Sequence, residues 1–192
     1  MSVSKEKRKG SASKSLKSFQ QKAKTSRNYA QIYKKAKEVK ANQKGLTDCD
    51  LITFLNCTPH FLGCFSDDEI SKLVLKPTCF IIVNLDISLG PGSHWIALGI
   101  FPNSIEVFDS LGFDIFNWTR VPCSLLTFLH NISRSRRVFV SPRLQPDDSN
   151  MCGFYCIYYI IRRAFSPFIN LTDNFDLTDF TVNDFKLQQF FQ

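Results

Sequence analysis

Cys152 is the residue of this sequence that most resembles a nucleophile. It follows Asn150-Met151, precedes Gly153 and opens an apolar run that continues to Phe165. The N-terminus of a helix places partial positive charge and unpaired N–H groups beside a side chain, which favours a thiolate. The adjacent glycine lets a backbone or a substrate approach closely. The competing interpretation is an inert core cysteine, because buried cysteines commonly serve packing alone.

A cysteine nucleophile needs a base, and the sequence contains three histidines, His60, His94 and His130. His94 begins an apolar segment directly after Gly-Pro-Gly-Ser at residues 90–93, which predicts a position at the mouth of a strand beside a loop. His60 lies in a predicted turn, and His130 lies near the end of a predicted surface helix. Position therefore favours His94, with a purely structural role as the alternative.

Two further polar residues have positions that suit such chemistry. Asp109 ends the segment that pairs with the His94 segment in a predicted hairpin, so its carboxylate can orient the imidazole and stabilise imidazolium. Taken alone, it fits better as a turn residue that caps residues 110–112. Gln145 lies seven residues before Cys152, and its amide can donate a hydrogen bond to an oxyanion. Taken alone, it is an ordinary loop glutamine.

Together these segments resemble the adenovirus protease family, which belongs to the wider group that includes the ubiquitin-like-protein proteases. The shared pattern is a His-Trp pair, an acidic residue on the next strand, then Gln and Cys-Gly at a spacing of seven residues. The resemblance covers roughly residues 45–168. The segments that carry it are residues 57–63, 92–95, 107–112 and 145–153.

The resemblance implies a cysteine endopeptidase that cleaves viral or virus-like-element precursor proteins at Gly-containing sites. It implies that Cys152 is the nucleophile, His94 the general base and then acid, Asp109 the residue that orients His94, and Gln145 part of an oxyanion hole with the Cys152 N–H. The chemistry requires no cofactor, whereas DNA and an activating peptide are candidate cofactors by resemblance.

Three departures distinguish this chain from the adenoviral pattern. Asp109 stands where the adenoviral enzymes carry Glu, and residues 133–144 contain no cysteine for a disulfide to an activating peptide. The basic N-terminal segment also has no counterpart there. This mixture indicates a relative encoded by a virus-like DNA transposon or a related virus.

The surrounding sequence predicts an α+β fold in which helices flank a small, mainly antiparallel sheet. Residues 152–165 are apolar on every side, and a helix with no polar face belongs at the centre of a protein. Predicted strands occupy residues 79–85, 95–101, 104–108 and 137–141, with a tight hairpin at Pro102-Asn103. One further predicted helix runs from the N-cap Thr47 to Cys57, and another begins at residues 66–69. A third occupies residues 114–132 with a break at Pro122, and a fourth occupies residues 182–191.

Charge divides the chain into two parts. Residues 1–44 contain fourteen Lys/Arg and two Glu, so a net charge of +7 for the whole chain leaves −5 for residues 45–192. We therefore predict a basic arm over residues 1–44, disordered or partly helical, and a protease domain over residues 45–192 that is long enough to bury a core. The arm is either a solubilising or nuclear-import tail or a non-specific DNA-binding segment that releases counterions. The residues assigned to DNA binding are Lys5, Lys7, Arg8, Lys9, Lys34, Lys35 and Lys37.

The sequence also argues against several classes of protein. Its first residues lack the apolar stretch of a secretory signal, and no apolar run reaches the length of a membrane span. Seven irregularly spaced cysteines favour free thiols in a reducing compartment. Cys57, His60 and Cys64 are metal-ligand types but number only three, so we predict no metal site. We expect a monomer in the host nucleus or the virion that acts on precursor polypeptides.

Two other function classes stay open at this point. A ubiquitin-like or SUMO-like isopeptidase acting on host conjugates would use the same four residues. A non-catalytic DNA-binding or capsid protein would have no use for them, so the intact set of His94, Asp109, Gln145 and Cys152 argues against that class.

Overall fold

The computed structural model describes residues 45–112 and 121–191, together with Ala30. Its strands are β1 (Phe61–Ser66), β2 (Cys79–Asn84), β3 (Trp95–Ile100), β4 (Ser104–Phe108) and β5 (Arg137–Val140). Its helices are α2 (Asp48–Leu55), α3 (Cys123–Ser133), α4 (Cys152–Phe165) and α5 (Asn183–Phe190), with short 3₁₀ turns η1 (Ile70–Lys72) and η2 (Phe180–Val182). The predicted basic arm and residues 114–120 of a predicted helix lie outside the described residues.

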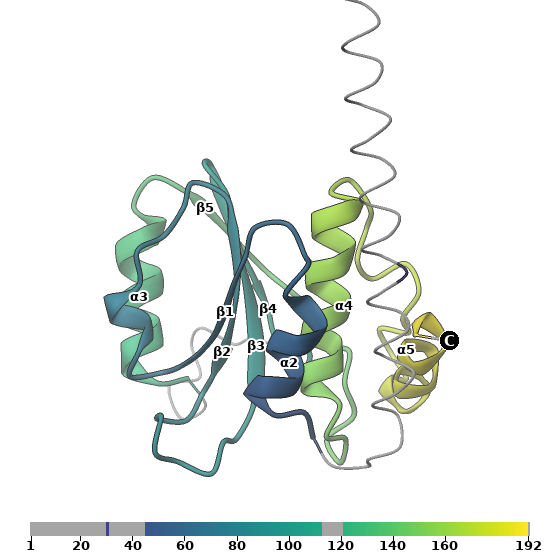
Figure 1. Ribbon diagram of the computed structural model, residues 1–192. Helices are drawn as coiled ribbons and strands as arrows, with labels where there is room; N and C mark the ends of the chain where they lie inside the picture. The colour runs from purple at the N-terminus through teal and green to yellow at the C-terminus, as the bar shows by residue number, and fades with distance from the viewer. Residues whose placement is uncertain (1–29, 31–44, 113–120, 192) are drawn as a thin grey trace, which may run out of the picture.

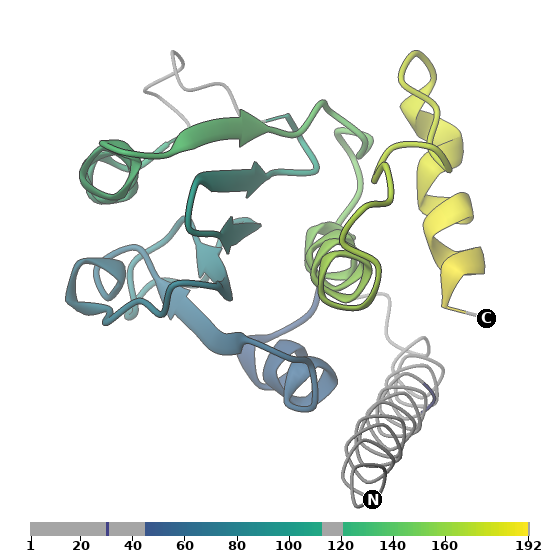
Figure 2. The same ribbon diagram turned by 90° about the horizontal axis from the view of Figure 1, so that it is seen from above.

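The five strands form one sheet, in the order β1-β2-β3-β4-β5, with helices on both faces. In Figure 1, α3 covers one face while α2 and α4 cover the other, and Figure 2 shows α5 lying outside α4. β2 is buried along its whole length because both of its faces are covered. Two hydrophobic clusters result, one around α4 and one under α3. The predicted α+β class is confirmed.

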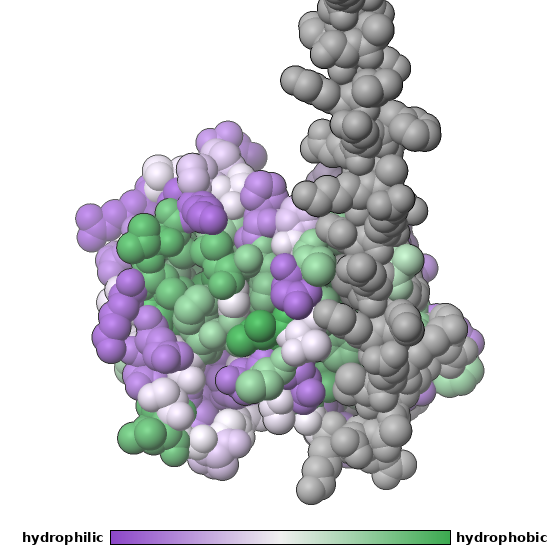
Figure 3. Space-filling view, in the orientation of Figure 1, coloured by the Kyte–Doolittle hydropathy of each residue, from purple (hydrophilic) through white to green (hydrophobic). Residues whose placement is uncertain are grey.

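The sheet is mixed rather than mainly antiparallel, which corrects the predicted pairing. The β2–β3 and β3–β4 pairs are antiparallel, as the predicted hairpin requires, but β1–β2 and β4–β5 are parallel. β1 was not predicted; its register shifts between Phe61 and Gly63, and Gly63 has a φ of 145°. A strand with such an irregularity lacks a clean alternating pattern. Figure 3 shows hydrophobic side chains over β1, where Leu62 and Phe65 are half-buried.

Local signals account for the ends of several helices. The Thr47 hydroxyl accepts a hydrogen bond from the Asp50 N–H, and the Asp50 carboxylate accepts one from the Thr47 N–H, so the predicted N-cap is confirmed as a capping box. α3 begins directly after Pro122, at the predicted break. The helix start predicted at residues 66–69 is wrong, because the Glu69 carboxylate closes a turn onto the Ser66 N–H and only η1 follows.

α4 is the central helix that the apolar sequence predicts. Every residue from 153 to 161 is buried. Gly99 of β3 leaves room for the Tyr159 side chain of α4, since a Cβ at that position would collide with the Tyr159 hydroxyl. The Tyr159 ring stacks on Phe108 of β4 at a centroid distance of 4.8 Å. Within the described ranges, neither α4 nor any other helix combines the length and apolarity that crossing a membrane requires.

Candidate active site

His94 and Asp109 meet at one end of the sheet. His94 precedes β3 and Asp109 follows β4, and the antiparallel pairing of Ala97 with Phe108 brings these two ends together. The Nε2 atom of His94 lies 2.6 Å from Oδ1 of Asp109, and the two side chains are only 13% and 11% exposed. The predicted hairpin thus places the imidazole directly against the carboxylate.

The Asp109 carboxylate is held in place by the turn that follows β4. Its Oδ1 atom accepts a second hydrogen bond, of 2.9 Å, from the Leu111 N–H. The Asp109 backbone is bonded on both sides to the Ser141 hydroxyl, which accepts from the Asp109 N–H at 2.9 Å and lies 2.8 Å from the Asp109 carbonyl. Because these contacts are internal to the protein, the carboxylate is oriented before any substrate binds.

Cys152 is the first residue of α4, and its thiol is hydrogen-bonded to the imidazole of His94. Since Nε2 contacts Asp109, the Nδ1 side of the ring is left for the sulfur. Burial alone would lower the pKa of His94, but the hydrogen bonds and charges of Asp109 and Cys152 outweigh it and raise the pKa to about 9. His94 is therefore protonated at neutral pH while it contacts the sulfur.

Trp95 connects the segments that surround the thiol. Its indole Nε1 donates a hydrogen bond of 2.9 Å to the Leu46 carbonyl, and its own carbonyl lies 3.4 Å from Sγ of Cys156 in α4. Gly153 packs so closely on Leu46 that an added Cβ would lie 3.1 Å from the Leu46 Cβ. Sequence reasoning missed Leu46, because its bond to Trp95 joins residues 49 positions apart and leaves no local pattern.

Gln145 lines the same cleft as Cys152, and its side-chain amide is hydrogen-bonded at both ends. The side chain is buried, with Oε1 accepting a 2.6 Å hydrogen bond from the Ser110 hydroxyl and Nε2 donating one of 2.7 Å to the Ser149 carbonyl. An amide nitrogen carries two protons, so the Ser149 bond uses only one of them. No side chain caps the N-terminus of α4. Gln145 and the first N–H groups of α4 can thus bind an anion together.

A cleft of about 700 Å³ opens over these groups. Its lining includes His94, Gln145 and Cys152, so three of the four predicted site residues face one space, and Asp109 lies behind His94. The loop between β2 and β3 forms one wall. Ser88 holds that loop, donating from both its N–H and its hydroxyl to the Asp68 carboxylate at 2.8 Å each.

The other thiols and histidines of the chain differ from this pair. All seven cysteines lie in the described part of the chain, and none of them forms a disulfide there. Burial raises the pKa of Cys64 to about 12 and also raises those of Cys79 and Cys156, so these three groups stay protonated. His60 and His130 are both exposed. His94 thus differs from both in being nearly buried between a carboxylate and a thiol.

Other residues singled out in the sequence do not join this site. Cys57, His60 and Cys64 form no metal-binding group, and the described residues contain no cluster of three or more His, Cys, Asp or Glu side chains that could hold a metal. The predicted DNA-binding residues lie outside the described residues. They are Lys5, Lys7, Arg8, Lys9, Lys34, Lys35 and Lys37.

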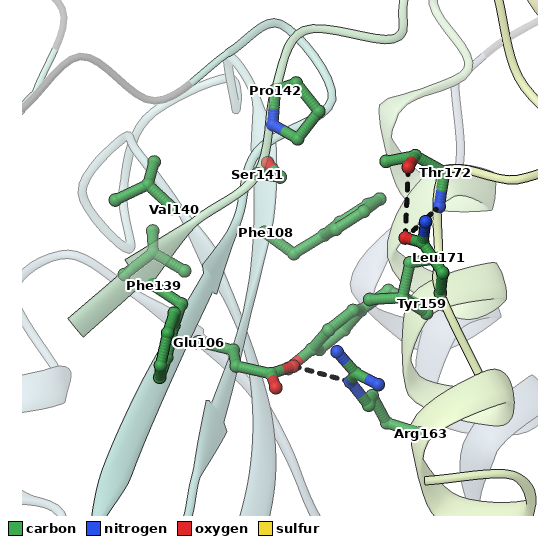
Figure 4. A pocket seen from close by; sticks show the side chains of 12 residues that line it. Glu106, Phe108, Phe139, Val140, Ser141, Pro142, Tyr159, Arg163, Leu171 and Thr172 are labelled. Atoms are coloured by element: carbon green, nitrogen blue, oxygen red, sulfur yellow. Dashed lines mark hydrogen bonds and ion pairs between the residues drawn. The ribbon is translucent and has the colours of Figure 1, made fainter. Parts of the chain in front are cut away.

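A second cavity, of about 300 Å³, lies further along β4 and α4 (Figure 4). There the Glu106 carboxylate accepts a 2.9 Å hydrogen bond from the Tyr159 hydroxyl and forms a 2.7 Å ion pair with Arg163. Nη1 of Arg163 donates to the carbonyls of Pro167 and Ile169. Neither a cysteine nor a histidine is among the residues that line this cavity in the described structure.

No protein-family model and no curated protein sequence matches this chain. Among solved structures, the ASFV pS273R protease is similar at 16% sequence identity and a TM-score of 0.52, over 78% of this chain and 67% of that one. The SUMO protease Ulp1, in a structure with its catalytic cysteine oxidised to a sulfenic acid, aligns at 15% identity and a TM-score of 0.40, over 86% of this chain and 91% of that one. The first of these likenesses shows that this chain shares the fold of the pS273R protease.

Proposed function

We propose that this chain is a cysteine endopeptidase that cleaves amide bonds through Cys152, His94 and Asp109. One observation carries the proposal: a single imidazole is hydrogen-bonded both to a nearly buried carboxylate, at 2.6 Å, and to a thiol at the start of a helix. This is the arrangement of an activated nucleophile, its base and the residue that orients the base. The fold shared with the pS273R protease supports the assignment.

The reaction runs through a thioester. The Cys152 sulfur attacks the substrate carbonyl carbon, the carbon–nitrogen bond breaks, and His94 gives its proton to the departing amine. A water molecule then attacks the thioester and gives a proton to His94, and the sulfur leaves as a thiolate that pairs again with imidazolium. Asp109 holds the ring and stabilises its charged form throughout.

The negative charge that develops on the substrate oxygen must be stabilised by hydrogen-bond donors. We assign this role to the Cys152 N–H at the start of α4 and to the remaining N–H of Gln145 Nε2, because both residues line the cleft. Their positions are set by the fold, so binding the oxyanion requires little reorganisation.

We propose precursor polypeptides with glycine next to the scissile bond as substrates. The Cys152 side chain is only partly accessible, and Trp95 and Gln145 line the cleft with it. A peptide without bulky side chains at this point can bring its carbonyl carbon to the sulfur. The same argument applies to the Gly-Gly ends of ubiquitin-like conjugates, so the assay must separate the two substrate classes.

A direct test compares internally quenched peptides that carry Gly-Gly or Gly-x-Gly with ubiquitin and SUMO fusions of matched concentration. The endopeptidase assignment predicts that the wild-type chain cleaves the peptides and that Cys152→Ala does not. Faster cleavage of a fusion than of every peptide would reassign the protein as an isopeptidase. Turnover that survives in Cys152→Ala would remove the peptidase assignment itself.

We further propose that residues 1–44 bind DNA without sequence preference and that the protein acts in the host nucleus or the virion. The support is the charge of this segment, with fourteen Lys/Arg against two Glu, whereas the catalytic cleft has Asp48 and Asp147 but no lysine or arginine among its described lining residues. Deleting residues 1–44 should abolish salt-dependent retention on DNA and leave peptide turnover in place. Unchanged retention would contradict this role, and adding DNA to the assay tests whether it stimulates turnover.

A further inference from the structure

We infer that Ser110 is a positioning residue, which holds the Gln145 amide in the orientation that presents an N–H to the oxyanion. The inference rests on the proposed peptidase function and extends it to a residue that does not touch the substrate. Ser110 directly follows Asp109, and its side chain is absent from the lining of the cleft.

The contact between the two side chains is short and excluded from water. The Ser110 hydroxyl donates to Oε1 of Gln145 at 2.6 Å, and both residues are 1% exposed. On the other side, Nε2 of Gln145 donates to the Ser149 carbonyl at 2.7 Å. The Gln145 amide is thus fixed between a hydrogen-bond donor, the Ser110 hydroxyl, and an acceptor, the Ser149 carbonyl.

These two partners determine which end of the amide is nitrogen. A carbonyl oxygen only accepts, so the Ser149 carbonyl requires Nε2 beside it, and the Ser110 hydroxyl then donates to Oε1. In the flipped orientation Oε1 would face the Ser149 carbonyl and the developing oxyanion, both of which repel it. Removing the Ser110 hydroxyl leaves Oε1 buried without its donor, which weakens the preference for the productive orientation.

Ser110 also holds the backbone of the same segment. Its carbonyl accepts hydrogen bonds of 2.8 Å from the N–H groups of both Leu144 and Gln145. Two adjacent residues at the end of β4 therefore serve the two halves of the site, since Asp109 orients the base and Ser110 orients the oxyanion donor.

The test separates oxyanion binding from thiol reactivity in Ser110→Ala. A Gly-Gly peptide aldehyde adds to the thiol and places its oxygen where the oxyanion forms, whereas alkylation by iodoacetamide forms no oxyanion. We expect kcat and aldehyde affinity to fall about tenfold, with KM and the alkylation rate of Cys152 changed less than about twofold. Ser104→Ala, which removes a half-buried hydroxyl from the start of β4, is the matched control and should change none of these.

A double-mutant cycle shows whether the effect passes through Gln145. Gln145→Ala should lower kcat by about 10²–10³-fold, and adding Ser110→Ala in that background should cost less than about twofold. Ser110→Thr keeps the hydroxyl and should recover aldehyde affinity. Parallel losses of aldehyde affinity and alkylation, or full additivity with Gln145→Ala, would overturn the inference. Failure of the proposed function itself looks different, because then either the wild-type chain cleaves no peptide or Cys152→Ala retains turnover.

Discussion

β4 and the residue that follows it present two acid–base pairs of nearly equal geometry, whose acidic residues are three positions apart. Glu106 pairs with Arg163 at 2.7 Å with side chains 20% and 19% exposed, and Asp109 pairs with His94 at 2.6 Å with side chains 11% and 13% exposed. Both pairs lie against α4, one near its end and the other at its start. Distance and burial therefore do not distinguish the Glu106–Arg163 pair from the pair proposed to be catalytic.

The two pairs differ in whether the basic side chain can exchange a proton and in what else it contacts. Arg163 stays charged, and its donors are directed at Glu106 and at the carbonyls of Pro167 and Ile169. His94 can gain and lose a proton, and it also contacts the Cys152 thiol. A pair of this kind becomes reactive only when its base is titratable and a nucleophile lies within reach.

The largest expected effect comes from removing the nucleophile or its base. Cys152→Ala and His94→Ala should each lower kcat/KM for a Gly-Gly peptide by at least about 10⁴-fold, because each removes a group that takes part in bond making. The counterpart change at the other pair, Arg163→Met, should leave kcat/KM of the folded protein within about threefold. A loss in Arg163→Met comparable to that in His94→Ala would show that the two pairs do not differ as described.

The next largest effect is expected for the orienting carboxylate. Asp109→Asn keeps the size of the side chain but removes its charge, and should lower kcat by about 10³–10⁴-fold with little change in KM. Glu106→Gln, on the strand that directly precedes Asp109, is the matched control and should retain turnover. Steady-state kinetics of both variants, with circular dichroism to confirm folding, checks this prediction. Equal losses in the two variants would argue for a general effect of charge on β4.

The free energy of unfolding should respond to Arg163→Met, although turnover should not. Arg163→Met leaves Glu106 partly buried without its cation, so the free energy of unfolding should fall by about 1–3 kcal/mol. Urea denaturation of this variant beside the wild type measures the change. An unaltered midpoint would mean that the Glu106–Arg163 pair does not stabilise the fold.

The smallest effect is a pH dependence that belongs to one pair alone. Folding raises the pKa of His94 from 6.5 to about 9, so its contribution to stability is complete below pH 6.5 and is lost as the pH rises through about 9. Turnover should decline over the same alkaline range, because the leaving amine needs the His94 proton. In Asp109→Asn the decline should begin at a lower pH. Turnover that stays constant to pH 10, or a decline centred near 6.5 in the wild type, would contradict the assigned charge state.

Much of the site was predictable from sequence because its residues lie at the ends of recognisable elements. The hairpin between β3 and β4 is local, and Cys152 opens an unmistakably apolar helix. The bond between Ser110 and Gln145 was not predicted, since it joins residues 35 positions apart and depends on how the segment after β5 returns to the sheet. The parallel pairing of β1 with β2 and of β4 with β5 was not predicted for the same reason. Strands joined by a crossover connection are paired by tertiary packing, which leaves no local signal in the sequence.

The most direct measurement is covalent labelling of the wild-type chain at pH 6 with a Gly-Gly peptide chloromethyl ketone, mapped by mass spectrometry. Cys49 and Cys123 are exposed, so they serve as internal references for labelling that depends on accessibility alone. We predict rapid modification of Cys152 alone, and loss of that modification in His94→Ala. Labelling that follows exposure, with Cys49 and Cys123 modified at least as fast as Cys152, would contradict the assignment of the nucleophile.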